Sequence, residues 1–102
     1  MNAQYKKGVL ELCVLSLLKK NDRYGYEISE YLSAHIDIAD GTVYPILRKL
    51  KDDGLLTTYL QEESGGPPRK YYSLTKLGCE TFEKERTEYL IFADIVARLI
   101  ED

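Results

Sequence analysis

The feature that most constrains the fold is an apolar segment near the N-terminus. Residues Gln4 to Lys20 have helical character, and apolar side chains occupy nearly the whole circumference of the expected helix. These side chains are Val9, Leu10, Leu12, Cys13, Val14, Leu15, Leu17 and Leu18. A helix that is apolar on all sides must be covered on all sides, which a chain of 102 residues can rarely do alone. We therefore expect part of this helix, including Leu12, to contact a second subunit.

Lys6 and Lys7 precede the apolar run, which gives it a superficial likeness to a secretory signal. However, Glu11 interrupts the run, and the polar residues 19–22 stand where a small-residue cleavage site would lie. The run is also too short to span a bilayer. We therefore expect a cytoplasmic protein without a membrane partner.

A second helix is expected over residues 24–32, after a turn at 21–23 and before a loop at 33–39. Its apolar face, at helical spacing, consists of Tyr24, Ile28, Tyr31 and Leu32. The only histidine of the chain, His35, is expected in the loop that follows.

A third helix is expected within Asp40–Leu55, because this segment carries signals at both ends. Asp40 or Thr42 can cap the first amides, and Gly54 can supply the left-handed turn that ends the helix. Pro45 suits the first turn, where an amide proton would have no helical partner. The apolar stripe of this helix consists of Val43, Ile46, Leu47 and Leu50.

The outer face of this third helix is basic and bears hydroxyl groups. It consists of Thr42, Tyr44, Arg48, Lys49 and Lys51. Two short helices in sequence, the second with such a face, are typical of a helix-turn-helix that enters the DNA major groove. Arg48 can pair with guanine O6 and N7, and Tyr44 can donate its hydroxyl to a phosphate. Thr42 and Lys49 are further candidate DNA contacts, Tyr26 is open to packing or to phosphate contact, and an ordinary solvated face is the alternative.

Two strands are expected after Gly54. Residues 55–62 alternate with period two, and Arg69–Leu74 resumes the pattern. The glycines and prolines of the intervening loop cannot continue a strand ladder. A hairpin directly after a helix-turn-helix describes a winged helix.

Arg69 and Lys70 follow the tip of this wing and are candidate contacts to backbone phosphate. The alternative is a surface ion pair with Glu62 or Glu63, which contributes about 0–1 kcal/mol.

Thr75 can cap a last helix that runs to about Ile100. A heptad seam follows from the spacing of Gly78, Phe82, Glu85, Tyr89, Phe92, Val96 and Leu99. At about 38 Å the helix is too long to be covered by so small a domain. We expect residues 1–74 to form the DNA-binding domain and residues 75–102 a dimerisation helix. The expected dimer contacts are Leu12, Phe82, Tyr89, Phe92, Val96 and Leu99.

The seam also contains candidates for an effector pocket. Tyr89 and Phe92, with Tyr5 of the first helix, could line a cavity between subunits, and a plain apolar core is the alternative. Glu85 must stay near solvent, find a basic partner such as Arg86 of a second subunit, or serve a ligand.

The charges are unevenly distributed along the chain, whose net charge is −3. Residues 1–78 carry 11 Lys and Arg against 10 Asp and Glu, whereas residues 79–102 carry 3 against 7.

Cys13 and Cys79 are expected as buried free thiols. With His35 they form no recognisable zinc set, and the chain has no nucleophile elbow or phosphate-binding glycine loop. We expect no enzymatic activity, catalytic residue, cofactor or metal.

Four blocks of this sequence resemble the PadR family of bacterial transcriptional regulators. They are Gly25-Tyr-Glu-Ile, Gly41-Thr-Val-Tyr-Pro-Ile-Leu-Arg-Lys-Leu, Gly54-Leu-Leu, and Gly65-Gly-Pro-Pro-Arg-Lys-Tyr-Tyr-Ser-Leu-Thr followed by Gly78. The resemblance covers nearly the whole chain. It implies a winged helix-turn-helix with a C-terminal dimerisation helix, acting as a homodimeric repressor at a palindromic operator. It also implies a response to a small aromatic or cationic effector.

The sequence thus predicts a mainly α fold with a small β-hairpin, namely a winged helix-turn-helix plus a long C-terminal dimerisation helix. A second functional hypothesis is a winged helix that binds only other proteins, with the acidic C-terminal part meeting a basic partner. The basic outer face of residues 42–51 favours double-stranded DNA, because a pure adaptor would not need it.

Overall fold

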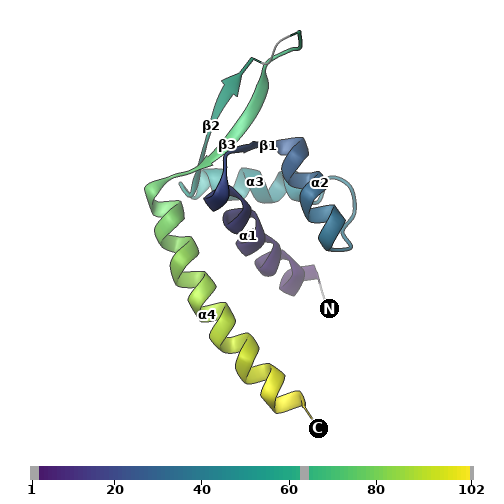
Figure 1. Ribbon diagram of the computed structural model, residues 1–102, viewed down its shortest axis with the longest axis vertical. Helices are drawn as coiled ribbons and strands as arrows, with labels where there is room; N and C mark the ends of the chain where they lie inside the picture. The colour runs from purple at the N-terminus through teal and green to yellow at the C-terminus, as the bar shows by residue number, and fades with distance from the viewer. Residues whose placement is uncertain (1–2, 63–64, 102) are drawn as a thin grey trace.

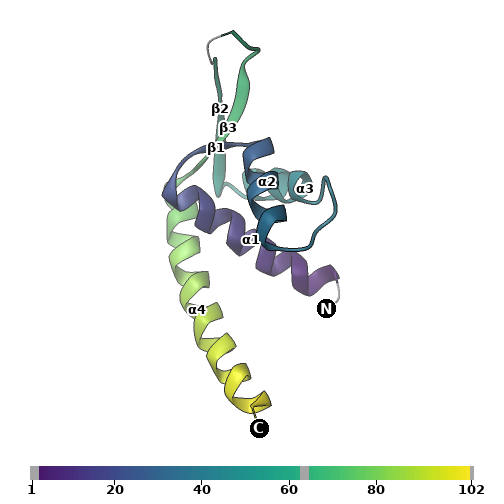
Figure 2. The ribbon, with the colours of Figure 1, turned by 45° about the vertical axis from the view of Figure 1, so that its right-hand side comes forward.

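The computed structural model describes residues 3–62 and 65–101, with the backbone alone at residues 3–7. The elements in chain order are α1 (Ala3–Lys20), β1 (Arg23–Tyr24), α2 (Gly25–His35), α3 (Val43–Asp52), β2 (Leu56–Gln61), β3 (Arg69–Leu74) and α4 (Lys76–Ile100). Figure 1 shows the β2–β3 hairpin projecting at one end of the molecule and α4 extending from the other. Turning the molecule leaves α4 well separated from the remaining elements along its last turns (Figure 2). The expected winged helix-turn-helix with a long C-terminal helix is confirmed.

The core forms around α1, which packs against α2, α3, α4 and β3. The buried side chains of α1 are Leu10, Val14, Leu15, Leu17 and Leu18. They meet Ile28 and Leu32 of α2 and the four residues of the predicted α3 stripe, Val43, Ile46, Leu47 and Leu50. Val9, Leu12 and Cys13 are only partly buried. One side of α1 therefore remains partly open, as its all-round apolar character implied.

The helix α3 begins and ends where the sequence predicts, but one expected capping hydrogen bond is missing. Thr42 stands at the N-cap, but its side chain makes no cap hydrogen bond because its backbone is already helical, with φ −60° and ψ −34°. Pro45 lies in the first turn, as expected. Gly54 has φ +78°, the left-handed conformation that ends the helix.

The region before α3 differs from the prediction. Residues Arg23 and Tyr24, expected in a turn and in a helix, form the strand β1, which pairs antiparallel with β3. The Tyr24 backbone is extended, with φ −85° and ψ 161°, and α2 begins at the next residue. The carboxylate of Glu27 accepts a hydrogen bond of 3.3 Å from the Tyr24 amide. The prediction was wrong here because β1 is held by a partner almost fifty residues away, which no local pattern reveals.

The helix α2 also runs further than expected, through residues 33–35, which were predicted as loop. His35 therefore lies in the last turn of a helix. Its Nδ1 donates to the Tyr31 carbonyl oxygen at 2.8 Å, and its ring lies 4.6 Å from the Tyr31 ring. Both contacts lie at the last turn of α2, which the sequence predicted as loop.

The sheet has the strand order β1-β3-β2, and both pairings are antiparallel. Leu56 and Leu60 share one face of β2, but Leu56 is buried whereas Leu60 is 71% exposed. The hairpin therefore projects beyond the helices and forms a free-standing wing (Figure 1). No helix in the described part of the chain is long and apolar enough to cross a membrane.

A short hydrogen-bonded junction joins the end of α3 to the start of α4. The Thr75 hydroxyl accepts from the Gly78 amide at 2.9 Å and donates to the Gly54 carbonyl oxygen at 2.7 Å. The Thr75 amide donates to the Leu55 carbonyl oxygen at 3.1 Å. A Cβ atom at Gly78 would overlap that same carbonyl oxygen, so only glycine permits this approach. The predicted cap by Thr75 is confirmed, and it also links two helices.

We predict that replacing Thr75 with Val lowers the free energy of unfolding by about 1–2 kcal/mol, because both hydroxyl bonds are lost. Thr75→Ser keeps the hydroxyl and should retain most of the stability. Thr87→Val is the matched control, since the Thr87 hydroxyl donates only to its own helix, at the Glu83 carbonyl oxygen. Urea unfolding at one fixed protein concentration measures all three. Equal losses for Thr75→Val and Thr87→Val would show that the junction contributes nothing.

Candidate nucleic-acid interface

The exposed face of α3 has two sides that the helix periodicity separates. Tyr44, Arg48 and Lys51 are spaced i, i+4 and i+7, so they share one side. Thr42 and Lys49 are seven residues apart and share the other. All of them lie away from the buried stripe.

The side that bears Arg48 faces the base of the wing. Tyr44, Arg48, Lys51 and Asp52 of α3 line a hollow of about 290 Å³ together with Lys70 and Tyr72 of β3. The Lys70 ammonium lies 5.9 Å from the centre of the Tyr72 ring. The structure thus brings together three cationic side chains, Arg48, Lys51 and Lys70, on one concave surface, which we call the basic hollow. Of the residues predicted from sequence, Tyr44, Arg48 and Lys70 belong to it.

Lys51 is a member of this hollow that the predicted set of DNA contacts omitted. Its position seven residues after Tyr44 was the available signal, because that spacing returns to the same side of a helix. The sequence had placed Lys51 on the outer face without assigning it a contact.

Lys49 points elsewhere. Its ammonium lies 3.3 Å from the carboxylate of Glu11 in α1 and 3.1 Å from that of Asp53. Hydrogen bonds to Asp53 and then to Glu11 raise the pKa of Lys49. The two carboxylates already offset the Lys49 charge, which weakens its attraction for a phosphate. The predicted set is therefore split, with Lys49 committed to the contact between α3 and α1.

Tyr26 lies at the start of α2 and is 59% exposed, so it is not a core residue. A hydrogen bond with the Glu30 carboxylate raises the pKa of its hydroxyl. Tyr26 and Tyr44 line a second hollow of about 290 Å³ between α2 and the beginning of α3. Tyr26 thus adjoins the basic hollow through Tyr44, which belongs to both.

Gly25 allows α2 to approach α3 closely. A Cβ atom there would lie 3.1 Å from Cε1 of Tyr44 and 3.6 Å from Cε1 of Tyr72. The Tyr44 ring therefore packs against the backbone of α2, and its position depends on the absence of a side chain at residue 25.

On the wing, Arg69 begins β3, and its guanidinium carbon lies 4.5 Å from the centre of the Tyr24 ring. No local pattern in the sequence predicts this contact. Of the acids considered as alternative partners of Arg69 and Lys70, Glu62 is described and exposed, and Glu63 lies outside the described residues.

The predicted seam residues of α4 are not equivalent. Phe82 is buried in the core of its own subunit, so its assignment to a dimer contact is corrected. Leu12 of α1 is partly buried against the same core. Phe92 is 56% and Leu99 77% exposed, with Tyr89 and Val96 intermediate.

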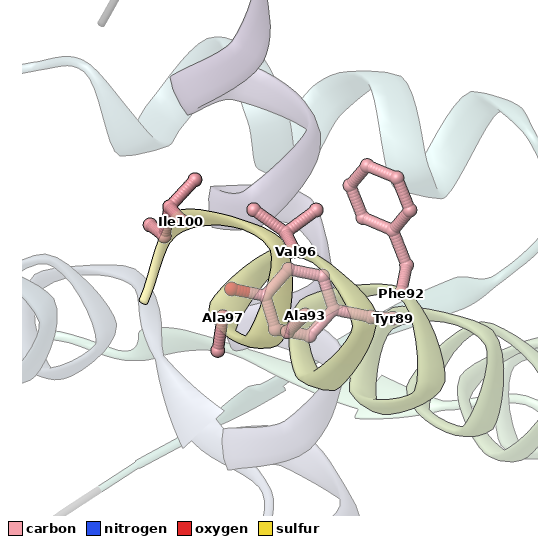
Figure 3. Close-up of a pocket in the computed structure, with 6 residues that line it drawn as sticks. All are labelled: Tyr89, Phe92, Ala93, Val96, Ala97 and Ile100. Atoms are coloured by element: carbon pink, nitrogen blue, oxygen red, sulfur yellow. The ribbon is translucent and has the colours of Figure 1, made fainter. Parts of the chain in front are cut away.

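The last turns of α4 form a hollow of about 190 Å³ on one side of the helix (Figure 3). It is lined by Tyr89, Phe92, Ala93, Val96, Ala97 and Ile100. Two of the four predicted effector contacts, Tyr89 and Phe92, belong to it. Glu85 is exposed elsewhere on α4, and the side chain of Tyr5 lies outside the described part of the chain.

Comparison with known proteins agrees with this arrangement. A family described as the transcriptional regulator PadR-like family matches residues 14–84. An uncharacterised protein of Lysinibacillus sphaericus is 36% identical over 93% of this chain and 91% of its own length. The negative transcriptional regulator PadR of Bacillus subtilis is 28% identical over 92% of this chain, which spans 52% of that protein.

Solved structures agree as well. A PadR-like transcriptional regulator from Bacillus cereus has a TM-score of 0.88 and 33% identity, covering 98% of this chain and 99% of that one. The match includes the helix-turn-helix, the wing and the long last helix. The chain therefore belongs to the PadR-like family of DNA-binding transcriptional regulators.

Proposed function

We propose that this protein is a cytoplasmic, homodimeric repressor that binds a palindromic operator through α3 and the wing. The observation that carries the proposal is the basic hollow, where Arg48 and Lys51 of α3 lie beside Lys70 of β3. Cations from a helix and from a neighbouring hairpin on one concave surface suit a DNA backbone with an adjacent groove.

The roles within the hollow follow from side-chain chemistry. Arg48 carries a planar fork that can pair with guanine O6 and N7, so it is the candidate for base recognition. Lys51 and Lys70 are point charges suited to phosphate. Because Lys49 is held by Glu11 and Asp53, we transfer the phosphate contact proposed for it to Lys51. Tyr44 and Tyr26 offer hydroxyls at the edge of the same surface.

The net charge of −3 does not oppose this role, because the acidic excess lies in residues 79–102. Charge affects DNA binding through its local distribution rather than its total. The negative regulator from Bacillus subtilis named above supports repression as the direction of control.

Dimerisation is supported by the apolar surface of α4. Its last turns expose Leu90, Ile91, Phe92, Ile95, Leu99 and Ile100 by more than half. Contiguous apolar surface of this kind usually marks a protein interface. We propose that residues 75–102 supply it, with Leu12 of α1 at its margin. Two copies of α3 would then enter major grooves about 34–36 Å apart.

We propose an effector site at the last turns of α4. The α4 hollow at Tyr89 and Phe92 is open in one subunit, and a second α4 would cover it. Its apolar and aromatic lining suits a small aromatic or cationic molecule, and Glu85 stays a predicted contact outside this lining.

The first test is the salt dependence of DNA binding, measured on DNA that the protein selects from a random pool. Lys51→Ala and Lys70→Ala should each lower the slope of log affinity against log salt by about 0.9, because one phosphate contact is lost. Arg48→Ala should relax base preference at one position, by about 1–3 kcal/mol. Lys49→Ala is the matched control and should leave the slope close to that of the wild type. A wild-type protein without salt-sensitive binding would contradict the proposal.

The second test concerns the dimer. Replacing Phe92 and Val96 together by Asp should give a monomer in sedimentation, because a carboxylate cannot be buried unpaired at an apolar seam. Leu60→Asp is the control, since Leu60 is 71% exposed on the wing, away from α4. If the dimer survives the double substitution, the interface lies elsewhere.

A further inference from the structure

Three tyrosines form a row across the sheet. Tyr24 of β1 pairs with Tyr71 of β3, which pairs in turn with Tyr59 of β2. The ring centres of Tyr24 and Tyr71 are 5.7 Å apart, and those of Tyr71 and Tyr59 are 5.6 Å apart and stacked. Because successive strand residues point to opposite faces, this row lies on the face opposite the buried Tyr72.

The row continues onto α2 and towards the recognition helix α3. The Tyr26 ring is stacked on that of Tyr24, with centres 6.5 Å apart and an interplanar angle of 17°. Tyr26 lines a hollow with Tyr44 of α3. The aromatic contacts therefore run from the wing to the first residues of α2, beside the hollow that Tyr26 shares with Tyr44.

Arg69 joins this line from the tip of the wing. It lies two residues before Tyr71 and is thus a diagonal cross-strand neighbour of Tyr24, within reach of a long side chain. Its guanidinium carbon lies 4.5 Å from the centre of the Tyr24 ring, a cation–π distance. The Arg69 side chain is thereby directed across the sheet towards α2, and not along the hairpin.

Tyr24 is itself fixed on several sides. Its backbone pairs with β3, and its amide donates to Glu27 at 3.3 Å. Its ring contacts those of Tyr26 and Tyr71. The ring that Arg69 contacts is therefore a rigid support.

We infer that Tyr24 is a positioning residue for DNA binding, which holds the Arg69 guanidinium beside the start of α2, where it can contact a phosphate. This inference rests on the proposed function. A guanidinium stacked on a ring keeps its N–H donors at its edge, where they can reach a phosphate. Holding the side chain before DNA arrives lowers the conformational entropy lost on binding.

The inference is tested by a double-mutant cycle in the full-length protein, with binding measured on the selected operator at 0.1 M salt. We expect Tyr24→Leu to weaken binding about two- to fivefold, the range of an exposed cation–π contact. Tyr24→Phe keeps the ring and should bind like the wild type. In the Arg69→Ala background, Tyr24→Leu should have no further effect, because Tyr24 acts through Arg69.

Two further variants separate positioning from a merely structural role. Arg69→Lys keeps the charge but loses the planar stack, so it should weaken binding by a similar factor without touching the core. As the control, Tyr31→Leu removes an exposed ring of α2 that lies against His35 and the Arg23 guanidinium, and it should leave affinity unchanged.

An equal effect of Tyr24→Leu in both backgrounds, or wild-type affinity of Arg69→Lys, would overturn the positioning role while leaving the proposed function intact. Absence of salt-sensitive binding by the wild type would overturn the proposed function and this inference together.

Discussion

The arrangement of the molecule depends on the junction between α3 and α4. One hydroxyl, that of Thr75, accepts from the Gly78 amide and donates to the Gly54 carbonyl oxygen. The missing side chain at Gly78 lets α4 start directly against the Leu55 carbonyl. The helix proposed to meet DNA and the helix proposed to join two subunits are thus linked by hydrogen bonds at this junction. The geometry of α4 would then set the separation of the two recognition helices. That separation must match the spacing of the half-sites in a palindromic operator.

A chain with a net charge of −3 can serve as a DNA-binding protein because its charges are sorted by position. Glu11 breaks the apolar surface of α1, and it forms an ion pair with Lys49 on one side of α3. That pair ties the helix to the core. The opposite side of α3 keeps Arg48 and Lys51, which lie with Lys70 on the basic hollow. The same short helix therefore divides its cations between an ion pair within the protein and the hollow proposed to meet DNA.

The sequence predicted what depends on local periodicity and failed where distant residues meet. The apolar stripe of α3, the two strands of the wing and the extent of α4 follow from spacing alone, and the structure has them. The strand β1 was missed because two residues carry no period and their partner lies in β3. The pairing of Lys49 with Glu11 was missed because 38 residues separate them. Phe82 fits the heptad, but proximity to α1 places it in the core of its own subunit.

The beginning of α2 connects the wing with α3 more closely than the order of the chain suggests. Gly25 lies against the rings of Tyr44 and Tyr72, so no side chain separates α2 from the recognition helix or the sheet. The neighbouring residue Tyr24 is hydrogen-bonded into that sheet and supports Arg69. A displacement of the wing would therefore move the surface on which Tyr44 rests. Because interiors are closely packed, such a shift is transmitted and not absorbed. The phosphate contacts proposed on the wing and the base contacts proposed on α3 would thus be mechanically coupled, so that affinity and specificity would change together.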